Sequence, residues 1–337
     1  MSILSSFIVL LLIKTLATIA ALQTLRYLNR YLSKLAQNNW VKSVPWTPTN
    51  EIALITGGSS GIGRQIVHDL AGLGLKAVVI WDVKELEGEL PPNVHFHKTN
   101  ITYPSSIHDS AIALRTQHGH PTILINNAGI AYSNTLLSSS EDEIRGTMEV
   151  NTLSHFWTTR EFLPAMLEKN HGHIVTMASM ASFAASGGLT VYSASKAALL
   201  GIHEGVSQEV KHFYEFGDGV GSRCRVRTRY NLPALTLYLL LGTLAKHISI
   251  IHPLYVATPM TSVLIENKSQ FRRPFMTAER VSAAVVKQIV SGNSGQVVVP
   301  ESHGGVVLLR GLPGWLQEVV RDWASRGFLR LMREQQK

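Results

Sequence analysis

Cysteine is almost absent from this sequence, since Cys224 is the only one among 337 residues. A single cysteine excludes intramolecular disulfides and any zinc site built on several cysteines. We predict no metal site. The composition fits a reducing compartment, or a domain that faces one.

The sequence also lacks a basic stripe interleaved with aromatic residues, although its formal net charge is +8. The scattered basic residues make nucleic acid an unexpected partner, and the positive surplus points to an anionic membrane surface instead. With 45% hydrophobic residues, the chain is long enough for one large α/β domain with appendages.

Charge is nearly missing from residues 2–25, where Lys14 is the one charged side chain. As a helix these residues would be about 36 Å long, enough to cross a hydrocarbon core of about 30 Å. Lys14 costs about 3 kcal/mol on insertion scales, and each of the many Leu, Ile, Val and Phe residues returns about 0.5 kcal/mol. We therefore predict a transmembrane or membrane-anchor helix over residues 1–25; whether it spans or lies in one leaflet stays open.

Basic residues follow this segment at Arg26, Arg30, Lys34 and Lys42, and none precedes it. The positive-inside rule then places the remainder in the cytosol. We expect the membrane to be that of the endoplasmic reticulum or a lipid droplet. The missing charged n-region argues against a cleaved signal peptide. We expect a polar, proline-containing linker over residues 26–50.

Residues 51–56 read as a buried strand that runs into a glycine-rich turn and a helix over residues 64–73. Glycines at 57, 61 and 63 would allow backbone to approach a pyrophosphate at the helix N-terminus. A second strand, over residues 77–81, is followed by Asp82. Its carboxylate can accept hydrogen bonds from ribose hydroxyls and would repel a 2′-phosphate. This favours NAD over NADP, with NADP left open because Lys84 is near.

Residues 56–63, Thr-Gly-Gly-Ser-Ser-Gly-Ile-Gly, resemble the TGxxxGxG motif of the short-chain dehydrogenase/reductase family. Residues 126–129, Asn-Asn-Ala-Gly, resemble the family's NNAG motif, and Asn100 stands where family members usually have an aspartate that contacts adenine. The resemblance implies cofactor contacts at Gly57, Ser59, Ser60, Gly61, Ile62, Gly63, Asp82, Asn100, Ile101, Asn127, Ala128 and Gly129.

Tyr192 and Lys196 are four residues apart, which puts them on one face of a helix. An ammonium beside a phenol would lower the phenol pKa from about 10, so that the tyrosine could exchange protons near neutral pH. Alone, this spacing is more often a solvated surface. Ser179, 13 residues before Tyr192, and Asn151, 28 residues before Ser179, complete a resemblance to the family's Asn-Ser-Tyr-Lys tetrad.

The resemblance implies reversible hydride transfer between a nicotinamide and an alcohol or carbonyl carbon. Tyr192 would exchange the proton, Lys196 would lower its pKa and hold the ribose, and Ser179 would donate to the substrate oxygen. Asn151 would hold a water linked to Lys196. After the catalytic helix, Val256 and Thr258 would face the nicotinamide amide, with Leu254 where the family usually has glycine.

Residues 229–248 form an apolar insertion, because residues 226–228 would join residues 249–253 as one strand without it. Three interpretations stay open: a lipid-facing insertion, an elaborated substrate loop, or a translated intron. The well-matched flanks favour the intron. Residues 312–337 read as an amphipathic tail that would lie on a membrane or form the core face of a closing helix.

We therefore expect an α/β protein with a doubly wound parallel sheet, the Rossmann fold, over residues 51–311, and an N-terminal membrane helix. It most resembles the membrane-anchored retinol and hydroxysteroid dehydrogenase branch. The expected function is NAD(P)-dependent interconversion of a lipophilic alcohol and its carbonyl compound. The alternatives are an NADPH-dependent ketoreductase of secondary metabolism and a catalytically dead membrane scaffold. The expected partners are a lipophilic small molecule and the membrane, and a homodimer is left open.

Overall fold

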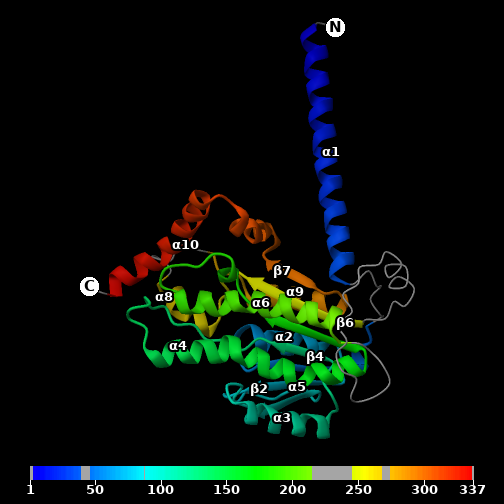
Figure 1. The fold of residues 1–337 in the computed structure, drawn as a ribbon, viewed down its shortest axis with the longest axis vertical. Coiled ribbons are helices and arrows are strands. Elements are labelled where there is room, and N and C mark those ends of the chain that lie inside the picture. Colours follow the sequence, from blue (N-terminus) through cyan, green and yellow to red (C-terminus); the bar gives the residue numbers. More distant parts are fainter. Residues whose placement is uncertain (1–2, 39–45, 87, 215–244, 268–273, 336–337) are drawn as a thin grey trace.

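The computed structural model describes residues 3–38, 46–86, 88–214, 245–267 and 274–335. In this part of the chain, parallel strands form one sheet in the order β3-β2-β1-β4-β5-β6-β7, with helices on both faces (Figure 1). The strands are β1 (Ile52–Thr56), β2 (Ala77–Asp82), β3 (Val94–Lys98), β4 (Ile123–Asn126), β5 (His171–Met177), β6 (Ala245–Pro253) and β7 (Gly295–Val299). The predicted doubly wound sheet is confirmed.

Helices alternate with these strands, and a long one precedes them. The α-helices are α1 (Ile3–Gln37), α2 (Gly61–Gly72), α3 (Pro104–Gln117), α4 (Glu141–Met148), α5 (Ser154–Glu168), α6 (Thr190–His212), α8 (Ser262–Glu266), α9 (Ala278–Val290) and α10 (Gly314–Gln335). A π-helical turn, η2 (Glu149–Leu153), joins α4 to α5. The 3₁₀ segments are η1 (Pro48–Asn50), η3 (Met180–Ser182), η4 (Pro259–Thr261) and η5 (Glu301–Gly311).

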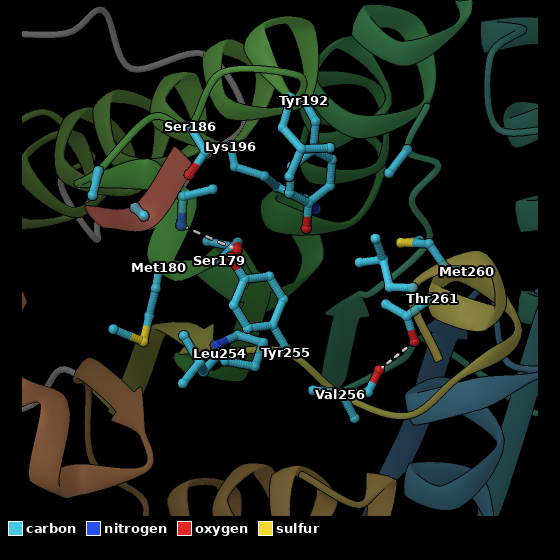
Figure 2. A pocket seen from close by; sticks show the side chains of 18 of the residues that line it. Ser179, Met180, Ser186, Tyr192, Lys196, Leu254, Tyr255, Val256, Met260 and Thr261 are labelled. Atoms are coloured by element: carbon cyan, nitrogen blue, oxygen red, sulfur yellow. Dashed lines mark hydrogen bonds between the residues drawn. The ribbon is translucent and has the colours of Figure 1, made fainter. Parts of the chain in front are cut away.

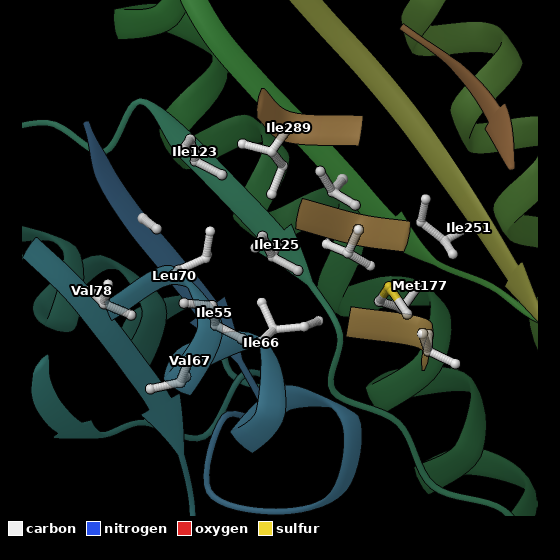
Figure 3. Close-up of a cluster of buried hydrophobic side chains, with 14 of the residues drawn as sticks. Ile55, Ile66, Val67, Leu70, Val78, Ile123, Ile125, Met177, Ile251 and Ile289 are labelled. Carbon is white, nitrogen blue, oxygen red and sulfur yellow. The ribbon is translucent and has the colours of Figure 1, made fainter. Parts of the chain in front are cut away.

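The sheet has an apolar layer on each face because its central strands are apolar at successive positions, as in other parallel sheets covered on both sides. Ile55 and its neighbours pack against Ile66 and Leu70 of α2 and against α9 (Figure 3). On the opposite face, Trp81 of β2 packs against Phe162 of α5, with ring centroids 5.5 Å apart. Because successive side chains of a strand point to opposite faces of the sheet, each strand contributes to both apolar layers.

The strand order reverses between β1 and β4, which is where open α/β sheets bind ligands at the carboxyl ends of their strands. Gly57, Asp82, Asn127 and Ala178 lie at or directly after the ends of four neighbouring strands. The motifs found in the sequence therefore meet at one edge of the sheet.

The expected linker over residues 26–50 is wrong in its first half, because α1 continues to Gln37. Residues 26–37 are rich in Leu, Arg, Lys, Ala and Gln and contain neither glycine nor proline, so nothing in them stops a helix. Within the described part of the linker, Pro48–Asn50 forms the short segment η1.

The boundary expected for the insertion, residues 229–248, is also wrong at its end. Residues 245–248 belong to β6, with Ala245 opposite His171 and Ile248 opposite Ile174 of β5. Ile248 is buried in the second apolar layer, which explains why the strand begins earlier than expected. Residues 226–228 and 229–244, on which the other interpretations of the insertion depend, lie outside the described residues.

The aromatic pair of Trp81 and Phe162 gives a test of the second layer. Replacing Phe162, which is 1% exposed, with alanine should lower the free energy of unfolding by about 3–5 kcal/mol, because the cavity cannot collapse between β2 and α5. Urea denaturation of the full chain in detergent, followed by tryptophan fluorescence, measures this change. Phe156→Ala is the matched control on the same helix, since Phe156 is 42% exposed and should cost well under half as much. Equal losses at the two positions would contradict this account.

Candidate active site

The glycine-rich turn after β1 forms a cradle at the N-terminus of α2. Gly57 adopts φ +67°, and a Cβ added there would lie 2.8 Å from the Ala128 backbone. Asn127 holds the turn from the next strand, because its Nδ2 donates to the carbonyl oxygens of Thr56 and Gly57, each at 3.0 Å. The NNAG loop therefore supports the glycine-rich turn.

Asp82 lies beside the cradle. Its carboxylate accepts hydrogen bonds from the backbone of Ser59 at 3.0 Å and of Lys84 at 3.1 Å. The Ser59 hydroxyl donates to the Lys84 carbonyl at 2.7 Å, so that the end of β2 and the glycine turn form one unit. Ser60 is the N-cap residue of α2 but makes no side-chain capping bond there. A glycine-rich turn at a helix N-terminus, with a carboxylate at its edge, fits a dinucleotide.

Asn100, which stands where the family usually has an aspartate that contacts adenine, uses its side-chain oxygen within its own loop. Its Oδ1 already accepts from the backbone and the hydroxyl of Thr102, at 3.1 and 2.8 Å. This local Asx turn is a bonding pattern that asparagine favours. Ile101, beside it, is 8% exposed and packs in the second apolar layer.

Tyr192 and Lys196 lie one turn apart on α6, as the spacing predicts, and both line the same pocket (Figure 2). The Lys196 Nζ lies 5.8 Å from the centre of the Tyr192 ring and donates to the Met177 carbonyl at 2.9 Å. A buried hydroxyl of Ser182 donates to the Lys196 carbonyl at 2.8 Å and ties α6 to the loop after β5. The lysine is thus anchored at both its backbone and its ammonium.

Burial dominates the electrostatics of the pair. It lowers the pKa of Lys196 from 10.5 to about 8. It raises the pKa of Tyr192, while a hydrogen bond with Ser179 acts in the opposite direction. The expected lowering of the Tyr192 pKa by Lys196 is therefore not found in this structure, because the cost of charging a buried phenol outweighs the hydrogen bond with Ser179.

Ser179 follows β5 and caps η3, where its Oγ accepts from the backbone of Ala181 at 3.2 Å. It lines the pocket together with Tyr192 (Figure 2). Ser182, the next serine in this loop, is fully buried and bonded to α6. Met180 and Ser186 line the same pocket.

Asn151 lies in the π-helical turn η2, between α4 and α5. Its Oδ1 accepts from the backbone of Ile130 at 2.8 Å, and its Nδ2 donates to the Ile130 carbonyl at 2.9 Å and to the Ser195 hydroxyl at 3.0 Å. The side chain therefore joins the NNAG loop to α6. A Cβ on Gly129 would lie 3.3 Å from Asn151 Oδ1 and 3.4 Å from Lys196 Nζ, so a glycine leaves both atoms room. The π turn, a feature often found at functional sites, turns Asn151 inward.

His252 was not among the predicted residues, although it contacts the catalytic loop. It is fully buried, and its Nδ1 lies 3.0 Å from the Ser179 carbonyl oxygen. Burial lowers its pKa to about 4, so the ring is neutral and donates from Nδ1, while Gln296 Nε2 lies 3.3 Å from Nε2. The sequence signal was a histidine in an otherwise apolar stretch directly before Pro253.

The segment after β6 closes the site from the other side. Thr258 lies against the glycine turn, because a Cβ on Gly61 would be 3.2 Å from its methyl group. The Thr261 hydroxyl donates to the Val256 carbonyl at 2.6 Å, which fixes this turn (Figure 2). Leu254, the departure from the family pattern, lines the pocket, and its backbone N–H donates to Val299 of β7.

The pocket that these residues surround has a volume of about 530 Å³, and most of its lining is apolar. Ile62, Asn127, Gly129, Ser179, Tyr192, Lys196, Val256 and Thr258 line it among the predicted residues. One wall was not expected: His303 and Val306 of η5 and Val320, Trp323 and Ala324 of α10. The C-terminal segment thus contributes to the site itself.

Comparisons with known proteins agree with this geometry. Residues 51–213 match the family described as short chain dehydrogenase. The chain is 46% identical to Dehydrogenase RED2 of Cochliobolus heterostrophus over 188 residues, which is 56% of this chain and 71% of that protein. It belongs to the short-chain dehydrogenase family. The predicted resemblance is confirmed, and the chain is an oxidoreductase of this family, with NAD(P) as cofactor.

A second curated relative and a solved structure are also similar to the chain. Human estradiol 17-beta-dehydrogenase 11 is 39% identical over 170 residues, 48% of this chain and 56% of that protein. The alignment therefore spans little more than half of that relative's length. A short chain dehydrogenase from Burkholderia phymatum in complex with NAD has the same fold, with a TM-score of 0.61 and 20% identity over 79% of this chain and 95% of that one.

The buried ammonium of Lys196 predicts that its removal stabilises the fold while it abolishes activity. The folded-state pKa of Lys196, about 8, is below the ordinary value of 10.5. Between these pH values the unfolded chain therefore binds more protons than the folded chain. The buried ammonium destabilises the folded state fully at pH 7, and this cost decreases as the pH rises to 10.5. Lys196→Met should abolish turnover yet raise the free energy of unfolding at pH 7 by about 2 kcal/mol, after the lost bond to Met177 is deducted. Urea denaturation at pH 7 and pH 10 measures the difference, which should shrink at the higher pH.

Lys98→Met, at an exposed position on the edge strand, controls for the loss of one positive charge. A Lys196→Met variant that is less stable than wild type at pH 7 would contradict the burial argument.

Proposed function

We propose that this chain is a membrane-held, NAD-dependent dehydrogenase that interconverts a lipophilic alcohol and its carbonyl compound, of retinoid, sterol or long-chain lipid type. The observation that carries the proposal is the largely apolar pocket of about 530 Å³ with the Tyr192 and Ser179 side chains in its lining. Apolar walls favour a substrate that is mostly hydrocarbon, and the two hydroxyls are the groups that would orient its single oxygen.

The dinucleotide would be held by the glycine turn, Asp82 and Lys196, and when bound it supplies the hydride chemistry. At pH 7 the Lys196 ammonium is charged and keeps donors beyond the one used by Met177, which suit ribose hydroxyls. The Tyr192 hydroxyl gives or takes the proton of the substrate oxygen. The Ser179 hydroxyl donates to the same oxygen and stabilises the charge that develops there.

NAD is the expected form of the cofactor because Asp82 stands at the end of β2, where a 2′-phosphate would meet a carboxylate already fixed by two backbone N–H groups. Like charges held this close repel, and no side chain needs to move to make the repulsion effective.

Membrane attachment is supported by α1. Phe7–Gln37 is long and apolar enough to cross a bilayer, and none of its apolar window is buried against the rest of the protein. The basic residues after residue 25 favour a cytosolic catalytic domain. We place the protein at the endoplasmic reticulum or on lipid droplets. Its relatives include proteins named as estradiol and hydroxysteroid dehydrogenases, which fits a lipophilic substrate.

A substrate panel run with both cofactors tests this function. Purified full-length protein should oxidise at least one sterol, retinoid or long-chain alcohol, with kcat/KM for NAD about tenfold or more above that for NADP. Asp82→Asn should narrow that ratio by removing the charge while keeping a carbonyl acceptor. A clear preference for NADPH would favour the ketoreductase alternative, and failure on the whole panel would favour a catalytically dead scaffold.

Loss of the Tyr192 hydroxyl should remove most of the activity found in that panel. Tyr192→Phe should lower kcat by about 100-fold or more, because general acid–base catalysis by one group is worth about 10²–10⁴. Tyr255→Phe is the matched control, since Tyr255 lines the same pocket and should lose less than about tenfold. Steady-state rates at saturating NAD measure both. Equal losses would contradict the assignment of Tyr192.

A further inference from the structure

The C-terminal segment exposes an apolar stripe. Trp315, Val319 and Trp323 recur every four residues along α10 and are 69%, 57% and 57% exposed, and Leu308 of η5 is 67% exposed. Residues four apart lie on one face of a helix. We call these four residues the C-terminal face. An exposed cluster of large apolar side chains marks a surface that a membrane or another protein covers.

The same segment forms part of the pocket, so the C-terminal face is connected with the active site. Val320 and Ala324 line the pocket from α10, and Trp323 both lines it and is more than half exposed, which places Trp323 at the mouth. Two hydrogen bonds hold the segment on the catalytic loop. Arg310 donates to the Ser182 carbonyl at 2.8 Å, and Ser325 Oγ accepts from the Gly187 backbone at 2.9 Å.

The orientation of α1 indicates what covers this face. The base of α1 is tied to the catalytic domain, because Asn38 Oδ1 accepts from the Ser294 backbone at 2.7 Å and Lys211 donates to the Ala36 carbonyl at 3.2 Å. From there α1 extends away from the sheet on the same side of the molecule as η5 and α10 (Figure 1). In this view η5 and α10 lie at the same level as the lower part of α1. Helix α3 lies on the opposite side (Figure 1).

We propose that the C-terminal face rests in the surface of the bilayer that α1 enters, so that the pocket mouth at Trp323 opens to lipid. Tryptophan is enriched at the depth of lipid headgroups, and Arg326 and Arg330, both exposed on α10, suit anionic headgroups. A lipophilic substrate then passes from the bilayer into the pocket without crossing water. The proposal rests on the membrane attachment proposed above, and its first test does not depend on catalysis.

Depth-dependent quenching tests the contact. In a full-length Cys224→Ser background, an environment-sensitive fluorophore is placed at Val319→Cys, at Ile112→Cys on α3 and at Ile8→Cys in α1, since Ile112 and Ile8 are also about half exposed. The protein is reconstituted into phosphatidylcholine–phosphatidylserine vesicles with acyl-brominated lipids. The label at 319 should be quenched at least threefold more than the label at 112.

The three labels separate the outcomes. Strong quenching at position 8 with equal, weak quenching at 112 and 319 would overturn the C-terminal contact while leaving the anchor in place. A label at 319 that responds to protein concentration but not to brominated lipid would make the face a contact between copies, and the lipid proposal would be wrong. If the enzyme were inactive on every substrate, the proposed function would be contradicted, but the quenching measured at the three labels would be unchanged.

Kinetics supply a second test on the same full-length protein. The double variant Leu308→Glu/Trp315→Glu changes the C-terminal face but none of the pocket lining. It should raise KM about tenfold for a long-chain secondary alcohol dissolved in vesicles and change KM for a short water-soluble alcohol by less than twofold. Ile112→Glu should change neither value. An equal rise for both alcohols would mean that the variant disturbs the pocket, and the proposed entry route would fail.

Discussion

A buried positive charge sets the conditions for the rest of the site. The Lys196 ammonium lies in a nearly dry environment and is held by one backbone carbonyl, that of Met177 at the end of β5. A charge there is costly, so the surrounding structure must hold the lysine where its ammonium finds polar partners. The contacts of Ser182 and Asn151 fix the segments that carry and surround the lysine. One ties the backbone of the lysine to the loop after β5, and the other ties α6 to the NNAG loop.

The same arrangement explains why the site lies where three segments distant in sequence converge. The parallel sheet brings the ends of β1, β4 and β5 to one edge, and α6 crosses above them. The hydrogen bonds of Asn127 and Asn151 then fix the loops to one another, so the hydroxyls of Tyr192 and Ser179 are positioned by packed strands and helices instead of by mobile loops. Such preorganisation is what electrostatic stabilisation of a reacting oxygen requires.

The sequence predicted the parts of this site that depend on local patterns. The glycine turn, Asp82 after β2 and the Tyr192–Lys196 spacing are each encoded within a few residues of one element. It could not predict what depends on contacts across the fold. His252, seventy-three residues after Ser179 in the chain, approaches it from β6, and burial in the assembled pocket raises the Tyr192 pKa. Neither effect leaves a periodicity or a motif in the sequence.

The pocket wall supplied by α10 has a consequence for how the protein is made. Helix α1 precedes the sheet in the chain, whereas Val320 and Trp323 follow all seven described strands. Chains emerge from the ribosome N-terminal end first. On the membrane attachment proposed above, α1 can reach the bilayer while Tyr192 and Lys196 are still being synthesised, and the pocket receives its wall only after α10 has left the ribosome. The closed pocket would then form last, at a surface to which the chain is already attached.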